Sequence, residues 1–181
     1  ATWLSTVPPI LVAELNAIDL DGDGRPELVA NCHHRALGTA YLFVYWPALG
    51  VWDPVLMHGG WIFHLQAIPG KETSHLRILS TSAALAELPV AAELAYARPG
   101  GAGRGAGSTV ATGITGVRLL SGASLAWYTP LDQAAPGQFD PSRGLRIDPQ
   151  GNSLFVMAGT PWTLDRWGNP TPGPNAGREL A

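Results

Sequence analysis

The sequence predicts an all-β fold, both from its composition and from its patterning. Glycine and proline, with 22 and 16 copies among 181 residues, together form about a fifth of the chain, which favours many turns and short strands over long helices. Runs of aromatic, β-branched and other apolar residues recur, each bounded by turn-forming residues. Acidic residues crowd together only at 19–27, and this segment is preceded and followed by apolar runs typical of strands.

The first half of the chain predicts strands that follow one another with short turns between them. After an extended lead-in, the clearest example is 41–46, a run of aromatic and β-branched residues, and the turn 47–50 leads into the return strand. The strands that we expect lie at about 10–18, 28–32, 41–46, 51–56, 61–68 and 75–80.

The second half is less regular. Residues 83–88 have helical propensity, which Pro89 ends, and apolar residues then alternate up to Tyr96 as in a strand. The glycine-rich segment 99–108 predicts a flexible connection; a phosphate-binding loop is the alternative, but no Lys-Ser/Thr pair follows it. We expect further hairpins at 115–128 (around Ser121-Gly122), 145–159 and 162–170.

These segments divide the chain into consecutive parts. Residues 1–98 carry the acidic segment and the first strands, and 99–108 form the glycine-rich connection. Residues 109–169 contain the further hairpins, and 170–181, rich in proline, glycine and polar residues, should form an irregular tail.

The acidic segment predicts a calcium-binding loop. Four carboxylates lie within nine residues, those of Asp19, Asp21, Asp23 and Glu27. They would repel one another in a compact loop, and a bound cation removes this repulsion. Ca²⁺ takes six to eight oxygen ligands at about 2.3–2.6 Å from such flexible loops, and Arg25 can add its backbone carbonyl. A solvated acidic turn without metal is the alternative interpretation.

The spacing of the acidic residues indicates which kind of calcium loop this is. A helix-loop-helix loop needs a glutamate at position 12, where this chain has Ala30, and residues 28–30 read as the start of a strand. The segment Asp19-Leu20-Asp21-Gly22-Asp23-Gly24-Arg25-Pro26-Glu27-Leu28 resembles the calcium loops of integrin-type FG-GAP/VCBS repeats, which form blades of β-propellers. That family usually has Asp where this chain has Glu27, and its Phe-Gly-Gly-Ala-Pro signature is absent here.

The resemblance implies a small or partial β-propeller-like module with one calcium loop. The strand segments suggest three or four degenerate blades of about 40–50 residues. A closed propeller needs at least four blades, so we expect a small or partial ring, or one that further sequence or another chain completes. A β-sandwich that carries the same loop is the alternative fold. The metal ligands that we expect for Ca²⁺ are Asp19, Asp21, Asp23, Arg25 through its carbonyl, and Glu27.

Composition narrows the expected partners. The net charge is −3 and Lys71 is the only lysine, so no basic stripe favours nucleic-acid binding. Only 14% of the residues are charged, against about 25% in average proteins, which favours a surface partly covered by protein partners or copies of the chain. The sequence contains no apolar stretch of about 18–20 residues, so it predicts no membrane-spanning segment. One cysteine excludes an internal disulfide, and calcium could replace such a staple.

Other motifs favour structural roles. In Asn31-Cys32-His33-His34, adjacent residues of a strand point to opposite faces, and no second cysteine completes a metal site. Histidines 58, 64 and 75 have no nucleophile elbow beside them that would indicate a catalytic triad. The tryptophans could line a glycan-binding face, although they more often pack inside a fold.

The function that we expect is non-catalytic. A calcium ion with a saturated carboxylate shell has no open position for chemistry, so it would hold the loop and a neighbouring surface in shape. We expect an extracytoplasmic module (extracellular, on the cell surface or periplasmic), where free Ca²⁺ fills weak sites. It would serve adhesion or be a structural subunit of a larger assembly. A hydrolase or lyase that acts on polysaccharide is the alternative.

Overall fold

The computed structural model describes residues 10–70, 73–82, 88–100, 110–111, 116–120, 122–131, 146–147, 152–157 and 160–172. Within these ranges the fold is all-β, as the sequence predicts, with strands and turns and no helix. The strands are β1 (Ile10–Ile18), β2 (Glu27–His34), β3 (Thr39–Trp46), β4 (Val51–Gly59), β5 (Ile62–Ile68), β6 (Thr73–Ser82), β7 (Leu88–Ala97), β8 (Val110–Ala111), β9 (Val117–Leu119), β10 (Ala123–Pro130), β11 (Arg146–Ile147), β12 (Ser153–Met157), β13 (Thr160–Leu164) and β14 (Pro170–Pro172).

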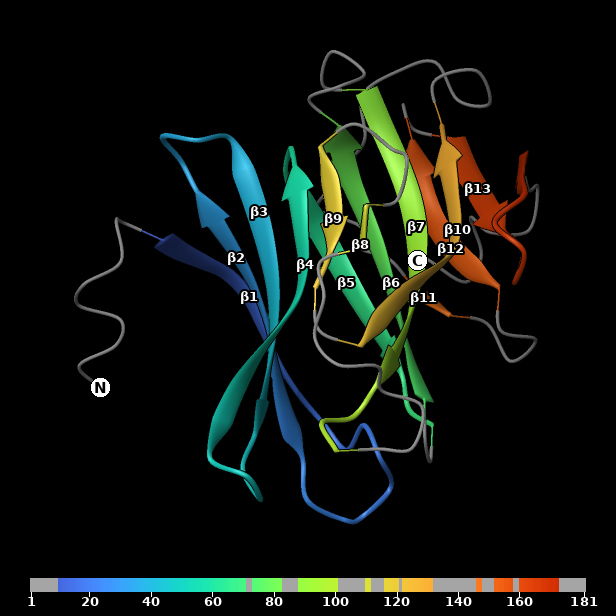
Figure 1. Ribbon diagram of the computed structural model, residues 1–181. Helices are drawn as coiled ribbons and strands as arrows, with labels where there is room; N and C mark the ends of the chain where they lie inside the picture. The colour runs from blue at the N-terminus through green and yellow to red at the C-terminus, as the bar shows by residue number, and fades with distance from the viewer. Residues whose placement is uncertain are drawn as a thin grey trace.

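The strands form three antiparallel sheets, none of which closes on itself. The first sheet has the order β1-β2-β3-β4-β9-β8, the second β5-β6-β7-β10 and the third β11-β12-β13-β14. Figure 1 shows the first sheet at the left and the third at the right, with the second between them. Each sheet therefore contains four strands that run up and down in chain order, and β8 and β9 extend the edge of the first sheet.

Alternation along β3 separates the two faces of the first sheet. Leu42 and Val44 are completely buried, whereas Tyr41, Phe43 and Tyr45 are only partly buried. Successive side chains of a strand point to opposite faces. Leu42 and Val44 therefore face the second sheet, with which they share a core, and the aromatic residues lie on the outer face.

The second sheet is covered on both faces, so the three sheets are stacked. Ile78 of β6 belongs to the main core, which lies between the first and second sheets, and the next residue, Leu79, belongs to another cluster that includes Trp162 and Leu164 of β13. The main core joins β2–β4 to β5–β7 through buried residues that include Val29, Leu42, Val44, Val55, Leu76, Ile78, Leu94 and Tyr96. Burial of this apolar area is the main force that holds the stack together.

Several buried polar side chains are paired across the sheets. The Tyr96 hydroxyl of β7 donates to the Asp53 carboxylate of β4, which links the first two sheets. Arg77 of β6 pairs with Glu93 of β7 and donates from Nη1 to Ser153 Oγ of β12 at 2.8 Å. Because a buried polar group without a partner is costly, these contacts favour one arrangement of the sheets over others.

The predicted strands of the first half are confirmed, with small differences in length. β2 extends beyond the expected range 28–32 to include His33 and His34, and β4 extends to Gly59. The alternating segment after Pro89 lies in β7. The helical propensity at 83–88 and the core of the glycine-rich segment fall largely on residues 83–87 and 101–109, which lie outside the described residues.

The prediction of a hairpin at 115–128 is wrong. β9 pairs with β4 and β10 pairs with β7, so the chain passes from the first sheet to the second between these strands. Leu120 N–H donates to the Val55 carbonyl, and the Gly122 carbonyl accepts the N–H of Ala97. The turn residues correctly indicate that the chain changes direction. Hydrogen bonds to distant segments, however, decide which sheet β9 and β10 each join.

The prediction of an irregular tail is also wrong for its first residues. Pro170–Pro172 form β14, which pairs with β13, and the hairpin predicted at 162–170 is thereby confirmed. Proline is tolerated here because an edge strand leaves some backbone N–H groups unpaired. Residues 173–181 lie outside the described part of the chain, as do residues 148–151 between the paired strands β11 and β12.

Candidate metal centre

The acidic loop joins β1 to β2 and is the blue loop at the bottom of Figure 1. The Asp19 carboxylate holds the loop curled: Oδ1 accepts the N–H groups of Gly22 at 2.8 Å and Asp23 at 3.1 Å, and Oδ2 accepts that of Gly24 at 2.9 Å. Gly22 and Gly24 have φ angles of 75° and 87°, which other residues rarely adopt. The two glycines and Asp19 therefore account for the shape of the loop.

Glu27 completes the loop from the first position of β2. This residue is only 2% exposed, and its Oε2 accepts the N–H of Leu20 at 2.8 Å. Burial raises the pKa of Glu27; the Leu20 hydrogen bond lowers the pKa, and the carboxylates of Asp21 and Asp23 raise it again, so that it lies above its usual value. A buried carboxylate beside like charges is unfavourable without a counter-charge, and a bound cation would supply that charge.

Three of the predicted ligands converge. One carboxylate oxygen from each of Asp19, Asp21 and Glu27 lies within 4.8 Å of the others. These oxygens are close enough to share one ion, because oxygens that bind Ca²⁺ lie about 2.3–2.6 Å from it. Carboxylate oxygens are hard ligands that suit Ca²⁺ or Mg²⁺. The donor set therefore fits the cation that the family resemblance implies.

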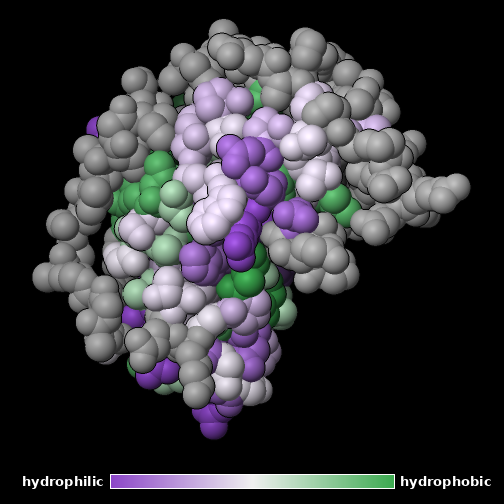
Figure 2. Space-filling view, turned by 90° about the vertical axis from the view of Figure 1, so that its right-hand side faces the viewer, coloured by the Kyte–Doolittle hydropathy of each residue, from purple (hydrophilic) through white to green (hydrophobic). Residues whose placement is uncertain are grey.

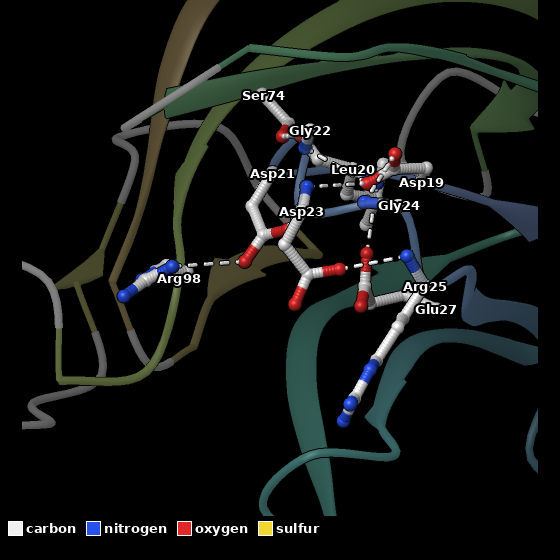
Figure 3. Close-up of polar contacts among 10 residues, drawn as sticks. All are labelled: Asp19, Leu20, Asp21, Gly22, Asp23, Gly24, Arg25, Glu27, Ser74 and Arg98. Atoms are coloured by element: carbon white, nitrogen blue, oxygen red, sulfur yellow. Dashed lines mark hydrogen bonds and ion pairs between the residues drawn. The ribbon is translucent and has the colours of Figure 1, made fainter.

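Of the other two predicted ligands, Asp23 lies in the same loop but outside this group of carboxylates, and Arg25 is expected to contribute its backbone carbonyl. Asp23 is exposed, and its Oδ1 accepts the N–H of Arg25 at 2.7 Å. The Arg25 side chain is exposed too and extends away from the carboxylates, as Figure 3 shows. The structure thus gathers Asp19, Asp21 and Glu27 and places Asp23 and Arg25 beside them.

Contacts from the second sheet hold the loop in place, and the sequence pattern does not predict these contacts. Leu20 is fully buried, and its carbonyl accepts the N–H of Gly70 at 3.0 Å and the hydroxyl of Ser74 at 2.7 Å. Ser74 lies in β6, 54 positions from Leu20. An ion bound in the loop would therefore be fixed to both sheets through Leu20.

A positively charged side chain already contacts the acidic group. Arg98, directly after β7, donates from Nη1 to Asp21 Oδ2 at 2.9 Å (Figure 3). The pair joins residues 77 positions apart, and no local pattern around Arg98 marks it. Beside the pair lies a hollow of about 180 Å³, lined by Asp21, Asp23, Trp46, Ala48, Leu49, Arg98 and Pro99.

The Cys-His-His segment of β2 does not converge on one point, as the alternation of a strand predicts. Cys32 lines a hollow on the outer face of the first sheet, and burial raises its pKa to about 11. His33 stacks on Trp61, which precedes β5 of the second sheet. His58 is completely buried and lies 3.3 Å from the hydroxyl of Ser80, measured from its Nε2. His33 and His58 thus pack against residues of the second sheet, and Cys32 lies on the outer face of the first sheet.

The outer face of the first sheet is apolar. Its hollow, about 240 Å³ in volume, is lined by Ile10, Val12, Leu15, Leu28, Ala30, Cys32, Phe43 and Trp52. Val12 and Leu15 are 58% and 56% exposed. The side of the molecule seen in Figure 2 differs: hydrophilic and intermediate residues cover most of its coloured area, and hydrophobic patches are small and separate.

Among the residues that the structure describes, no helix has the length and apolar character needed to cross a membrane. Comparison with protein-family models, with curated proteins and with solved structures gives no match.

Proposed function

We propose that this protein is a calcium-binding, β-propeller-like module that acts without catalysis, in adhesion or as a structural subunit of a larger assembly. The observation that carries the proposal is the convergence of Asp19, Asp21 and the buried Glu27. A cation bound there would offset the like charges of the loop. Because Leu20 connects the loop to the second sheet, the ion would stabilise the junction of two sheets.

The stacking of the sheets supports a propeller-like arrangement over a two-layer sandwich. A sandwich packs two sheets face to face, whereas this chain stacks three antiparallel sheets and covers both faces of the middle one. The acidic loop connects the first two strands of a sheet, as in the repeats that it resembles. Blades of a propeller are four-stranded sheets of this kind.

The apolar outer face of the first sheet supports a role in an assembly. Sheets that face water usually alternate between apolar and polar residues, but the hollow over β1–β4 is lined by apolar and aromatic side chains and Cys32. Exposed apolar patches of this kind mark surfaces that bind another polypeptide. We propose a second copy of the chain, packed sheet against sheet, as the partner at this face.

Calcium availability supports an extracytoplasmic location, whether extracellular, at the cell surface or periplasmic. Extracellular calcium modules work with dissociation constants of about 10⁻⁴–10⁻³ M. Two of the five expected ligands, Asp23 and Arg25, are exposed, so the loop can exchange its ion with the solvent. Millimolar Ca²⁺ would keep such a loop occupied.

Thermal unfolding with and without Ca²⁺ tests the proposal. Ligand that binds only the folded state stabilises it by RT ln(1 + [L]/Kd), which gives about 2.7 kcal/mol at 100 times Kd. We expect the melting temperature of the wild type to rise as free Ca²⁺ replaces EGTA, and to rise less with Mg²⁺, which demands near-octahedral geometry. Asp21→Ala and Glu27→Gln should lose most of this gain.

Asp165→Ala is the matched control, since it removes a carboxylate from a turn in the third sheet, far from the acidic loop in sequence. It should lower the melting temperature by itself and keep the full gain from Ca²⁺. Equal melting temperatures of the wild type in EGTA and in about 5 mM Ca²⁺, which is roughly five times the weakest dissociation constant of extracellular sites, would refute a stabilising ion.

A further inference from the structure

Both carboxylate oxygens of Asp21 accept hydrogen bonds, and one of the two donors is a charged group. Oδ1 accepts the N–H of Asp23 at 3.2 Å, and Oδ2 accepts from Arg98 Nη1 at 2.9 Å. The donors to Asp19 and Glu27 are different in kind, because the oxygens of these two residues accept neutral backbone N–H groups. A backbone N–H can share an oxygen with a metal ion at little electrostatic cost, whereas a guanidinium cannot.

We propose that Arg98 is a built-in competitor of the cation: it pairs with Asp21, and it must leave or weaken this pair when the ion binds. This inference rests on the proposed calcium site. A divalent ion at about 2.3–2.6 Å from an Asp21 oxygen would stand close to the positive charge of Arg98, and like charges at such distances repel. Arg98 therefore lowers the affinity of the loop for the ion.

The surroundings of Arg98 allow it to move aside without disturbing the fold. Its side chain is 51% exposed, whereas that of Asp21 is 8% exposed. The hollow of about 180 Å³ beside the pair, with Leu49 and Pro99 in its wall, leaves space for a displaced guanidinium. Of the two side chains, only that of Asp21, the expected ligand, is held firmly by its surroundings.

The position of Arg98 couples the ion to the second sheet. Arg98 follows directly on the last residue of β7, whereas Asp21 belongs to the loop of the first sheet. The pair links the acidic loop to the end of β7 (Figure 3). With the ion, this link is released while the links from Leu20 to Gly70 and Ser74 remain. Binding of the ion would therefore change the contacts of Arg98 at the end of β7.

Calcium titration of Arg98→Gln by calorimetry tests the inference in the intact chain. A surface ion pair is worth at most about a fivefold change in an equilibrium constant, so we expect Kd for Ca²⁺ to fall about two- to fivefold. Arg98→Lys keeps the positive charge and should stay near the wild type. Arg35→Gln removes an exposed arginine after the other end of β2 and should leave Kd unchanged.

Melting of the metal-free proteins gives a second readout, which does not depend on calcium binding. In EGTA, Arg98→Gln should melt below the wild type, since Asp21 loses its counter-charge; in Ca²⁺ this deficit should shrink or reverse. An unchanged or higher Kd in Arg98→Gln, with clear binding to the wild type, would overturn the inference and leave the proposed calcium site intact. If no variant binds Ca²⁺, the calcium site itself fails and the inference falls with it.

Discussion

At the scale of single residues, Gly168 shows how closely the third sheet approaches the second. It lies in the turn between β13 and β14 with a φ angle of 82°, and its carbonyl accepts the hydroxyl of Thr129 in β10 at 2.7 Å. A Cβ atom at this position would lie 2.6 Å from two ring carbons of Trp127. Two separate requirements, a left-handed backbone and close contact with a tryptophan ring, therefore select glycine here.

We expect Gly168→Ala to be strongly destabilising. The left-handed conformation costs a residue with a side chain about 1–2 kcal/mol, and overpacking against Trp127 adds about 1–3 kcal/mol. Gly50 provides the control, because its φ angle is 66° but a Cβ atom at its position would have no neighbour within 4 Å. Urea unfolding should show a loss in Gly168→Ala that exceeds the loss in Gly50→Ala by at least about 1 kcal/mol. Equal losses would show that the contact with Trp127 relaxes freely.

At the scale of elements, the turn from β13 to β14 is organised by one carboxylate. Asp165 Oδ1 accepts the N–H groups of Trp167 and Asn169, both at 2.8 Å, and Oδ2 accepts from the Asn169 side chain at 2.9 Å. Slight burial raises the pKa of Asp165, but the hydrogen bonds from Asn169, Trp167 and Gly168 outweigh this, and the pKa lies below its usual value of 3.8. The charged form of Asp165 therefore stabilises the folded turn.

We expect Asp165→Ala to cost about 1 kcal/mol at neutral pH, since it removes hydrogen bonds from a half-exposed turn. A carboxylate with a lowered pKa in the folded state contributes stability above its usual pKa, and this contribution is lost as the pH falls through the lower folded value. The difference in unfolding free energy between wild type and variant should thus be constant from about pH 7 to 5 and shrink below about pH 4. A difference that stays constant down to about pH 2 would contradict the role of the charge.

Local sequence patterns predict individual strands, turns and some hairpins between neighbouring strands well in this chain, but they do not predict which strands pair over longer distances. The run 41–46 and the turn after it become β3, β4 and their connection, because apolar alternation and turn residues act over a few positions. The prediction of a hairpin at 115–128 fails because it concerns strand pairing: β9 and β10 pair with strands that lie much earlier in the chain. The same limit applies to the acidic loop. Its carboxylates can be identified from their spacing in the sequence, but the contacts that Ser74 and Arg98 make with it from the second sheet cannot.

At the scale of the whole molecule, the stack of sheets is open on the side of the first sheet. The second sheet has a core on each face, but beyond β1–β4 the apolar hollow is not covered by any residue that the structure describes. The chain thus packs four-stranded sheets face to face and leaves one further face of similar apolar character. A second copy of the chain could cover this face with its own equivalent face in a two-fold symmetric contact, which is the commonest symmetry of protein oligomers.

We expect this contact to appear as concentration-dependent dimerisation in light scattering coupled to size exclusion. Leu15→Glu places a charge on the outer face at a side chain that is 56% exposed, so the fold should tolerate it, whereas an interface would have to bury an unpaired carboxylate. Since burial of one leucine is worth about 1.5–3 kcal/mol, the dimer should weaken by at least about tenfold. Leu37→Glu, at a side chain 64% exposed in the turn between β2 and β3 and outside the hollow, should dimerise like the wild type. A wild type that stays monomeric at high concentration, or equal weakening by both substitutions, would exclude the outer face as a contact between copies and leave it to a different polypeptide.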